Sequence, residues 1–306
     1  MSTPRFLVSD TVAQALAEHR PVVALETTLV THGLPQPEGV RVALELEAAI
    51  LVRGAVPATI GVVEGAVRVG MTAEELEQMG ARRGVAKLNL SNFAAELAGG
   101  SSGSTTVAAT MFAASRVGIS VFATGGIGGV HRGTSGDVSA DLTAFSRYPV
   151  AVVCAGAKAM LDLPRTVEML ETLGVPILGF GTSEFPAFYR RSSGLPVDRV
   201  FDAIAPLAEA VRAHFALGFG TGVVVGNPIP AEHELPREVY ELALAAALRD
   251  ASEAGVSGRA VTPFLLDRMR SLTEGSSVAT NRALLMNNAA VAAALAVAMA
   301  TAAIPR

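Results

Sequence analysis

The stretch Val150-Ala-Val-Val-Cys-Ala-Gly-Ala-Lys158 is an apolar run that ends in a turn of small residues and a lysine. A short run of apolar, β-branched residues without polar alternation is typical of a strand buried on both faces. A second such run, Pro21-Val-Val-Ala-Leu-Glu26, is followed by apolar residues at helical spacing over residues 39–53. Short strands that alternate with longer helices predict βαβ units and a largely parallel sheet.

The rest of the chain repeats this alternation. We expect further strands at residues 58–63, 67–69, 86–89, 120–124, 175–180 and 221–225. We expect helices at residues 72–80, 105–117, 164–173 and 203–215, and from residue 238 onward with breaks near 255–258 and 274–276. Residues 67–69 are expected to pair with 58–63 as a hairpin, and Thr72 with Glu75 forms a capping box. No segment has the composition of an interdomain linker. We therefore predict one domain over residues 1–306, of the α/β class, a three-layer α/β/α sandwich around a mostly parallel mixed sheet.

Composition excludes several classes of protein. Half of the residues are hydrophobic, 17% are charged and the formal net charge is -4, unlike the basic surface that a nucleic-acid-binding protein needs. Cys154 is the only cysteine, so an intrachain disulfide and a zinc site with several cysteines are excluded. Residues 289–304 are apolar but short and rich in alanine, which favours a core helix over a membrane span. No signal peptide is recognisable at the N-terminus, and we expect a cytoplasmic protein with no membrane or nucleic-acid partner.

Four polar residues fall where expected strands end. They are Glu26, Lys87, Thr124 and Lys158. Ligands of such sheets bind at the carboxyl ends of the strands, so we expect these side chains to share one crevice.

Lys158 and Glu26 each have two interpretations. Lys158 is either a surface lysine with a buried stem or a desolvated amine that attacks a carbonyl or anomeric carbon. Glu26 either caps the following turn or acts as a general acid/base, which requires a partly buried carboxyl.

The stretch Asp137-Val-Ser-Ala-Asp141 places two carboxylates around a hydroxyl. They are either helix-capping residues or, in part, ligands of a hard divalent cation. The glycine-rich loop at residues 125–132 either cradles an anion with its amides or permits tight turns. Asn281 is either a structural hydrogen bonder in a helix or a group that recognises a base edge.

Together these segments resemble the pseudouridine-5'-phosphate glycosidase family, also called the indigoidine synthase A-like family. The resemblance covers nearly the whole chain. The matching stretches are Ala24-Leu-Glu-Thr-Thr-Leu29, Thr31-His-Gly-Leu-Pro35, Gly54-Ala-Val-Pro-Ala-Thr-Ile60, Lys87-Leu-Asn-Leu-Ser91, Thr105-Thr-Val-Ala-Ala-Thr110, Ala123-Thr-Gly-Gly-Ile-Gly-Gly-Val-His-Arg-Gly133, Asp137-Val-Ser-Ala-Asp-Leu142, Cys154-Ala-Gly-Ala-Lys158 and Val261-Thr-Pro-Phe-Leu265.

The resemblance implies reversible cleavage of the C–C bond between uracil and ribose 5-phosphate. It implies that Glu26 is the proton donor and that Lys158 is the nucleophile that holds ribose C1' covalently as an iminium. The substrate contacts it implies are Lys87, Val107, Ser139, Ala140 and Asp141, with Thr124, His131 and Asn281 as neighbours. A C-glycoside has no heteroatom leaving group, so one acid and one amine suit this chemistry better than the two carboxylates of ordinary glycosidases.

The resemblance also implies a metal ion and an assembly. Asp137 is the implied ligand of one Mn²⁺-type ion whose shell is completed by water, and members of the family are homotrimers with an α/β/α core. The chain departs from the family at Gly133-Thr-Ser-Gly136, a segment that is shorter than usual just before Asp137.

Two other functions compete with this one. A ribokinase-like sugar or nucleoside kinase would have a similar α/β layout, but the C-terminal helices lack the glycine-rich anion hole of such kinases. A sugar-phosphate sensor would keep the pocket without the chemistry, and the presence of both Glu26 and Lys158 argues against it.

Overall fold

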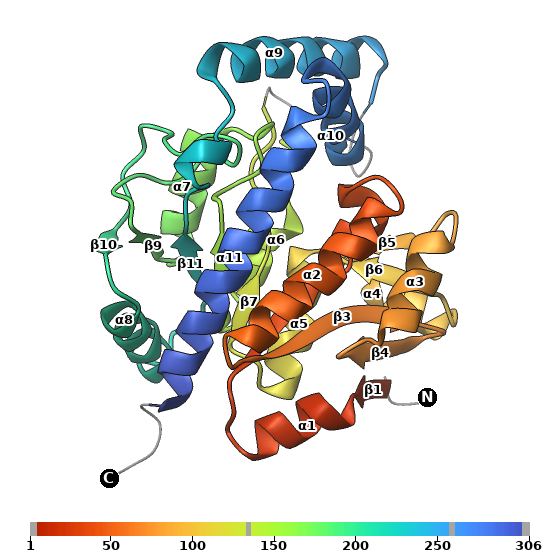
Figure 1. Ribbon diagram of the computed structural model, residues 1–306, viewed down its shortest axis with the longest axis vertical. Helices are drawn as coiled ribbons and strands as arrows, with labels where there is room; N and C mark the ends of the chain where they lie inside the picture. The colour runs from red at the N-terminus through yellow and green to blue at the C-terminus, as the bar shows by residue number, and fades with distance from the viewer. Residues whose placement is uncertain (1–4, 133–135, 257–260, 302–306) are drawn as a thin grey trace.

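A computed structural model describes residues 5–132, 136–256 and 261–301 as one α/β unit (Figure 1). Its strands are β1 (Arg5–Val8), β2 (Val22–Glu26), β3 (Val56–Val63), β4 (Ala66–Val69), β5 (Ala86–Leu88), β6 (Gly103–Thr105), β7 (Val121–Ala123), β8 (Ala151–Cys154), β9 (Ile177–Phe180), β10 (Arg199–Phe201) and β11 (Val223–Gly226). They form one sheet in the order β1-β4-β3-β2-β7-β8-β11-β9-β10, with β6 attached to β3 and β5 attached to β6.

The sheet is mostly parallel, as the sequence predicts. The central pairs β2–β7, β7–β8, β8–β11 and β11–β9 are all parallel. Antiparallel pairing is confined to β3, which pairs in this way with β4 and β6. The expected hairpin of residues 58–63 and 67–69 is therefore confirmed, since Val62 lies opposite Val67.

Helices cover both faces of the sheet (Figure 1). The helical segments are α1 (Asp10–Ala17), η1 (Leu29–Gly33), α2 (Glu38–Val52), α3 (Ala73–Ala81), α4 (Phe93–Ala98), α5 (Val107–Val117), α6 (Ala140–Phe145), α7 (Leu163–Thr172), α8 (Ile204–Ala216), η2 (Ala231–His233), α9 (Arg237–Glu253), α10 (Val261–Leu272) and α11 (Ser276–Thr301). Helix α11 crosses one face over β2, β7 and β8 beside α2, and α5 packs with α6 against the other face. The predicted three-layer arrangement is confirmed.

Most predicted elements lie within a few residues of their expected bounds. The capping box of α3 is present, since Thr72 accepts from the Glu75 amide and Glu75 accepts from the Thr72 amide. The sequence analysis missed the edge elements β1, α1 and β10, and it assigned residues 99–104 to a loop although β6 begins at Gly103. Strands of three or four residues at a sheet edge carry too few apolar positions to form a recognisable pattern.

Helix α11 is long and apolar enough to cross a membrane by length and composition alone. In the fold it packs against the sheet and against α2 and α8, as expected of a core helix (Figure 1). Its described part ends at Thr301, so the last residues of the predicted apolar stretch lie outside the described residues, as do 257 and 258 of the expected break.

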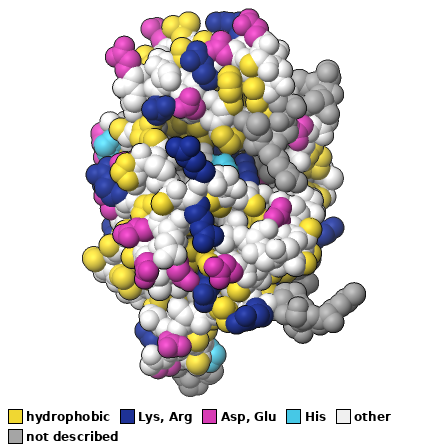
Figure 2. Space-filling model, turned by 90° about the vertical axis from the view of Figure 1, so that its right-hand side faces the viewer, with side chains coloured by type: hydrophobic (Ala, Val, Ile, Leu, Met, Phe, Trp, Pro, Cys, Tyr) yellow, Lys and Arg dark blue, Asp and Glu magenta, His cyan; other side chains and the backbone are white. Residues whose placement is uncertain are grey.

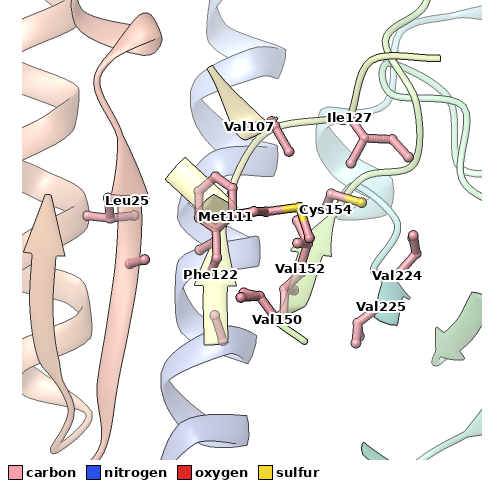
Figure 3. Packing of buried hydrophobic residues seen from close by; sticks show 14 of the residues in the cluster. Leu25, Val107, Met111, Phe122, Ile127, Val150, Val152, Cys154, Val224 and Val225 are labelled. Atoms are coloured by element: carbon pink, nitrogen blue, oxygen red, sulfur yellow. The ribbon is translucent and has the colours of Figure 1, made fainter. Parts of the chain in front are cut away.

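The core is densest around β7 and β8. Phe122 and Cys154 are fully buried there, and Val107 and Met111 of α5 pack onto them (Figure 3). Burial raises the pKa of the Cys154 thiol to about 12, so this lone cysteine behaves as a small apolar side chain. The stretch that begins at Val150 is therefore a central strand, as predicted.

The surface carries both signs of charge. On the face shown in Figure 2, Lys and Arg side chains form a broken column, and Asp and Glu side chains lie beside it. Such interspersed charge differs from the single-sign surface typical of nucleic-acid binding.

Candidate functional site

The carboxyl ends of the strands surround a cavity of about 280 Å³. Its lining consists of Glu26, Thr28, Lys87, Asn89, Ser91, Thr106, Gly128, His131, Asp137, Val138, Ser139, Ala140, Asp141, Lys158, Leu161 and Thr262. Besides Glu26 and Lys158, six of these residues are site residues implied by the sequence resemblance: Lys87, His131, Asp137, Ser139, Ala140 and Asp141. Thr124 does not line this cavity, but its hydroxyl contacts Glu26.

Strand order explains why Glu26 and Lys158 meet. Glu26 is the last residue of β2, Thr124 directly follows β7, and Lys158 follows the small-residue turn after β8. These three strands are neighbours and parallel, so their carboxyl ends lie along one edge. The predicted crevice shared by Glu26, Lys87, Thr124 and Lys158 is formed as expected.

The turn before Lys158 is held in one shape. Gly156 adopts a φ of 77°, and a Cβ at this position would lie 1.7 Å from the Pro186 carbonyl oxygen. The Lys158 amide donates to the Ile127 carbonyl at 3.0 Å, which ties the turn to the glycine-rich loop. The backbone thus fixes where the lysine stem enters the cavity.

Glu26 lies in an environment that favours its protonated form. Burial raises the pKa of the Glu26 carboxyl above its ordinary value, and the charge of Asp141 acts in the same direction. The positive charge of Lys158, the hydrogen bond from Thr124 and the charge of Lys87 partly offset this rise in pKa. The Thr124 hydroxyl donates to Glu26 Oε1 at 2.5 Å. A carboxyl held in this way suits a proton donor.

Asp141 organises the backbone around the cavity. Its Oδ1 accepts from the Ala108 amide at 2.9 Å and its Oδ2 from the Gly128 amide at 2.7 Å. Ser139 is the N-cap of α6, and its hydroxyl accepts from the Asp141 amide at 3.2 Å. The helix-start interpretation is therefore confirmed for Asp141, which lies in the first turn of α6, but the N-cap is Ser139 rather than Asp137. Asp141 and Ser139 also line the cavity.

Four amides of the glycine-rich loop bond to protein acceptors, and its glycines allow close packing. The amides of Ile127, Gly128, Val130 and His131 donate to Gly156, Asp141, Thr166 and Asp137, respectively. A Cβ at Gly128 would lie 2.2 Å from the Ser139 hydroxyl, and one at Gly126 would lie 2.6 Å from the Phe188 ring. The alternative in which this loop binds an anion through its amides is wrong for these four amides, because protein acceptors already occupy them.

Asp137 and His131 lie together at one side of the cavity. His131 Nε2 is 3.9 Å from Asp137 Oδ2, and the Asp137 side chain is 37% exposed. Among the described residues, no group of three His, Cys, Asp or Glu side chains is placed to hold a metal ion. Asp137 fits a hard ion held by one carboxylate with water and substrate oxygens, the donors that Mg²⁺ and Mn²⁺ accept. Residues 133–135, which belong to the segment where the chain departs from the family, lie outside the described residues.

A second cavity of about 60 Å³ adjoins the first. Glu26, Thr28, Lys87, Lys158 and Thr262 line both cavities. The second one adds Leu29, His32, Gly33, Thr124, Gly125, Gly126, Phe188, Pro263, Leu266, Asn281 and Leu285. Thr124 and Asn281, the neighbours implied by the resemblance, therefore line the same cavity as Glu26 and Lys158.

One residue predicted to contact the substrate lies elsewhere. The Val107 side chain is 1% exposed and packs into the core beside Ile127 (Figure 3). The predicted contact of Val107 with the substrate would therefore use the backbone at the start of α5.

The sequence analysis missed several lining residues. Asn89, Ser91, Thr106 and Thr262 line the larger cavity, and His32 lines the smaller one. Their signal lay in the stretches that carry the family resemblance, where we assigned them no role. Thr106 is also the N-cap of α5, since its hydroxyl accepts from the Ala109 amide at 3.4 Å.

Comparison with known proteins places this site in a family. The family model for indigoidine synthase A like protein matches residues 11–298. The chain belongs to the indigoidine synthase A-like family. Among its curated relatives, pseudouridine-5'-phosphate glycosidase of Methylobacterium nodulans is 50% identical over 98% of this chain and 89% of its own length. The enzyme of that name from Paracoccus denitrificans is 51% identical over 97% of this chain and 99% of its own length.

Solved structures show the same fold. Prealnumycin C-glycosynthase AlnA, determined in complex with ribulose 5-phosphate, matches 98% of this chain and 99% of its own with a TM-score of 0.90 and 38% identity. An indigoidine synthase A-like protein from Thermotoga maritima matches 97% of both chains with a TM-score of 0.88 and 36% identity. These comparisons give no support to the sugar-kinase alternative.

Proposed function

We propose that this chain is a pseudouridine-5'-phosphate glycosidase that reversibly cleaves the C–C bond between uracil and ribose 5-phosphate. The observation that carries the proposal is the meeting of Glu26 and Lys158 in one cavity, with burial raising the pKa of the carboxyl. The names of two relatives support it, since both are called pseudouridine-5'-phosphate glycosidase and are 50% and 51% identical to this chain in sequence. The phosphosugar in AlnA supports a pentose-phosphate ligand for the fold.

The chemistry follows from the bond that must break. When C1' separates from the base, the bonding electrons remain on the base carbon, which must receive a proton. We assign that proton to Glu26. The Lys158 amine bonds to C1' as the C1'–O4' bond breaks, and the proton lost by the amine passes to O4', which opens the sugar. Cleavage of the bond from C1' to the base then leaves an iminium between Lys158 and C1'. Water hydrolyses this iminium to ribose 5-phosphate and free lysine, and the proton released returns to the Glu26 carboxylate.

The two cavities support a division of the substrate. The larger cavity offers the polar groups of Lys87, Ser139 and His131 to the sugar phosphate. Ala140 and Asp141, the first two residues of α6, also line it. The smaller one has Thr124 and Asn281 beside the apolar Phe188 and Leu285, which suits a planar base. Lys158 and Glu26 stand between them, where the scissile bond must lie.

We also propose a divalent ion of the Mn²⁺ type at Asp137, a homotrimer, and a cytoplasmic location. When bound, such an ion supplies positive charge for phosphate or hydroxyl oxygens of the substrate. The hard oxygen donors at Asp137 support the ion, while the trimer rests on the family resemblance. The packed position of α11 supports a protein without a membrane anchor in that helix.

The direct test is incubation with pseudouridine 5'-phosphate and Mn²⁺ while free uracil is followed by chromatography. We expect uracil and ribose 5-phosphate in equal amounts, and their recombination when both are supplied. Absence of reaction in both directions would refute the proposal.

A second experiment isolates the lysine. Borohydride reduction in the presence of ribose 5-phosphate should attach the reduced sugar to Lys158, detectable by peptide mass spectrometry. Lys158→Ala should abolish both the label and the turnover, and a label that persists in this variant would assign the nucleophile elsewhere. Arg147→Ala, at a residue that does not line either cavity, serves as the control.

A further inference from the structure

His32 lines two cavities, one of which also contains Glu26 and Lys158. It lies in η1, the single helical turn that follows Glu26 in the chain. It lines the smaller cavity together with Glu26, Lys158 and Asn281. It also lines a further cavity of about 240 Å³, which shares His32, Gly33, Pro263, Leu266 and Asn281 with the smaller one.

One edge of the imidazole ring is anchored to the protein. His32 Nδ1 is 2.5 Å from the Thr31 hydroxyl and 3.4 Å from the Ser104 hydroxyl. The Thr31 hydroxyl donates its single proton to Ser104 at 2.8 Å. Thr31 therefore accepts from the ring, which places the proton of a neutral imidazole on Nδ1.

The opposite edge faces open space. His32 Nε2 forms no hydrogen bond with the described residues, yet it is not among their enclosed unpartnered polar atoms. With its proton on Nδ1, a neutral ring presents Nε2 as a hydrogen-bond acceptor. Burial and the nearby charge of Lys87 both lower the pKa of His32, which keeps the ring neutral.

We propose that His32 is a specificity-determining residue whose Nε2 accepts a hydrogen bond from a ring N–H of the pyrimidine base. The inference deepens the proposed function and rests on it, because it assigns the base to the cavity that His32 shares with Asn281. Uracil carries two ring N–H donors and two carbonyl acceptors. An acceptor at His32 and an amide at Asn281, which both donates and accepts, match such a donor–acceptor edge.

This arrangement discriminates between bases, because a base without an N–H at this position leaves His32 Nε2 without a hydrogen bond. A base with a ring nitrogen that lacks hydrogen would set two acceptors against each other. A methyl group on the same nitrogen would remove the donor and collide with the ring. A site built to bond a donor rejects an analogue that lacks it more strongly than an apolar pocket does.

The sharpest variants separate the two edges of the ring. In His32→Asn, the amide nitrogen takes the place of Nδ1 and keeps the anchor to Thr31, but no acceptor reaches the position of Nε2. In His32→Gln, the longer side chain restores an acceptor near that position. We expect His32→Asn to raise KM for uracil about 10-fold in the synthetic direction, because the variant loses one hydrogen bond to the base. We expect His32→Gln to recover most of it.

Two further measurements distinguish a role of His32 in base recognition from a role in the reaction of Lys158 with the sugar. Borohydride labelling of Lys158 by ribose 5-phosphate involves no base, so it should be unchanged in His32→Asn. Preference for uracil over uracil methylated on a ring nitrogen should fall in that variant, both in turnover and in uracil binding by calorimetry. Unchanged uracil KM and unchanged preference would overturn the inference, as would an equal loss of labelling and turnover. Failure of the proposed function is distinct, since the unaltered protein would then neither label nor release uracil.

Discussion

At the scale of single residues, the site depends on the protonation of Glu26. Its side chain is half-buried at the end of β2, and the Thr124 hydroxyl donates to its Oε1 at 2.5 Å. Desolvation favours the neutral acid because the charged form loses its hydration. The same burial that makes a carboxylate costly thus prepares a proton donor.

The raised pKa of Glu26 predicts a pH dependence. A proton donor is active below its pKa, so kcat/KM for uracil release should fall as pH rises through the raised pKa of Glu26. Thr124→Val removes a hydrogen bond that lowers this pKa, so the fall should move to higher pH. A pH–rate profile of both proteins checks the shift. A movement to lower pH, or retention of activity in Glu26→Gln, would contradict the assignment.

Asp137 offers a second prediction at this scale. Asp137→Asn removes the charge that a divalent ion would bind while keeping the size of the side chain. We expect the Mn²⁺ concentration for half-maximal activity to rise by about 10-fold or more. Direct Mn²⁺ binding followed by electron paramagnetic resonance gives a readout independent of turnover. An unchanged metal titration would place the ion elsewhere.

At the scale of elements, one buried side chain joins α11 to the sheet. Asn288 is fully buried, and its amide donates to the Thr124 carbonyl at 2.8 Å. Its oxygen accepts from Asn227 at 2.9 Å, just beyond β11. Asn288 therefore connects the helix with the ends of β7 and β11, next to the residue that contacts Glu26.

Removal of this connection should destabilise the fold. Asn288→Ala leaves the Thr124 carbonyl and the Asn227 amide without their partner in a dry environment, at a cost of about 1–3 kcal/mol. Asn287→Ala is the matched control, because Asn287 is only half-buried and donates once, to the Pro228 carbonyl. Urea unfolding of the two variants measures the difference. Equal free energies of unfolding would show that the buried contact contributes nothing specific.

Elements with strong patterns were predictable, and those with weak patterns were not. The central strands β2, β3, β8 and β11 are apolar runs that local sequence identifies. The edge strands β1 and β10 are half-exposed, so their composition resembles a loop. Strand β6 was hidden for a different reason: it is fully buried between β3 and β5, but its residues are Gly, Ser and Thr, which resemble a loop.

At the scale of the whole molecule, the prediction concerns the assembly of several copies of the chain. Large apolar side chains are exposed on the described surface, at Leu51, Val52, Leu217, Phe219 and Leu242 among others. A contiguous patch of such side chains would mark a contact between subunits, whereas single ones are ordinary on a surface. We expect a homotrimer, which light scattering should show as about three times the 31.4 kDa of the chain. A monomeric mass over a wide range of concentration would contradict the trimer.

The sequence by itself determined the class of fold and placed Glu26 and Lys158 at the ends of strands, because apolar strand patterns and strand-end polar residues are local features. The family resemblance added the substrate and the roles. Only the tertiary structure decided which of those residues meet, because strand order is set by long-range pairing that no local pattern encodes. It moved the Val107 side chain into the core, bonded the glycine-rich loop to Asp141, and brought His32 to the cavity of Glu26 and Lys158.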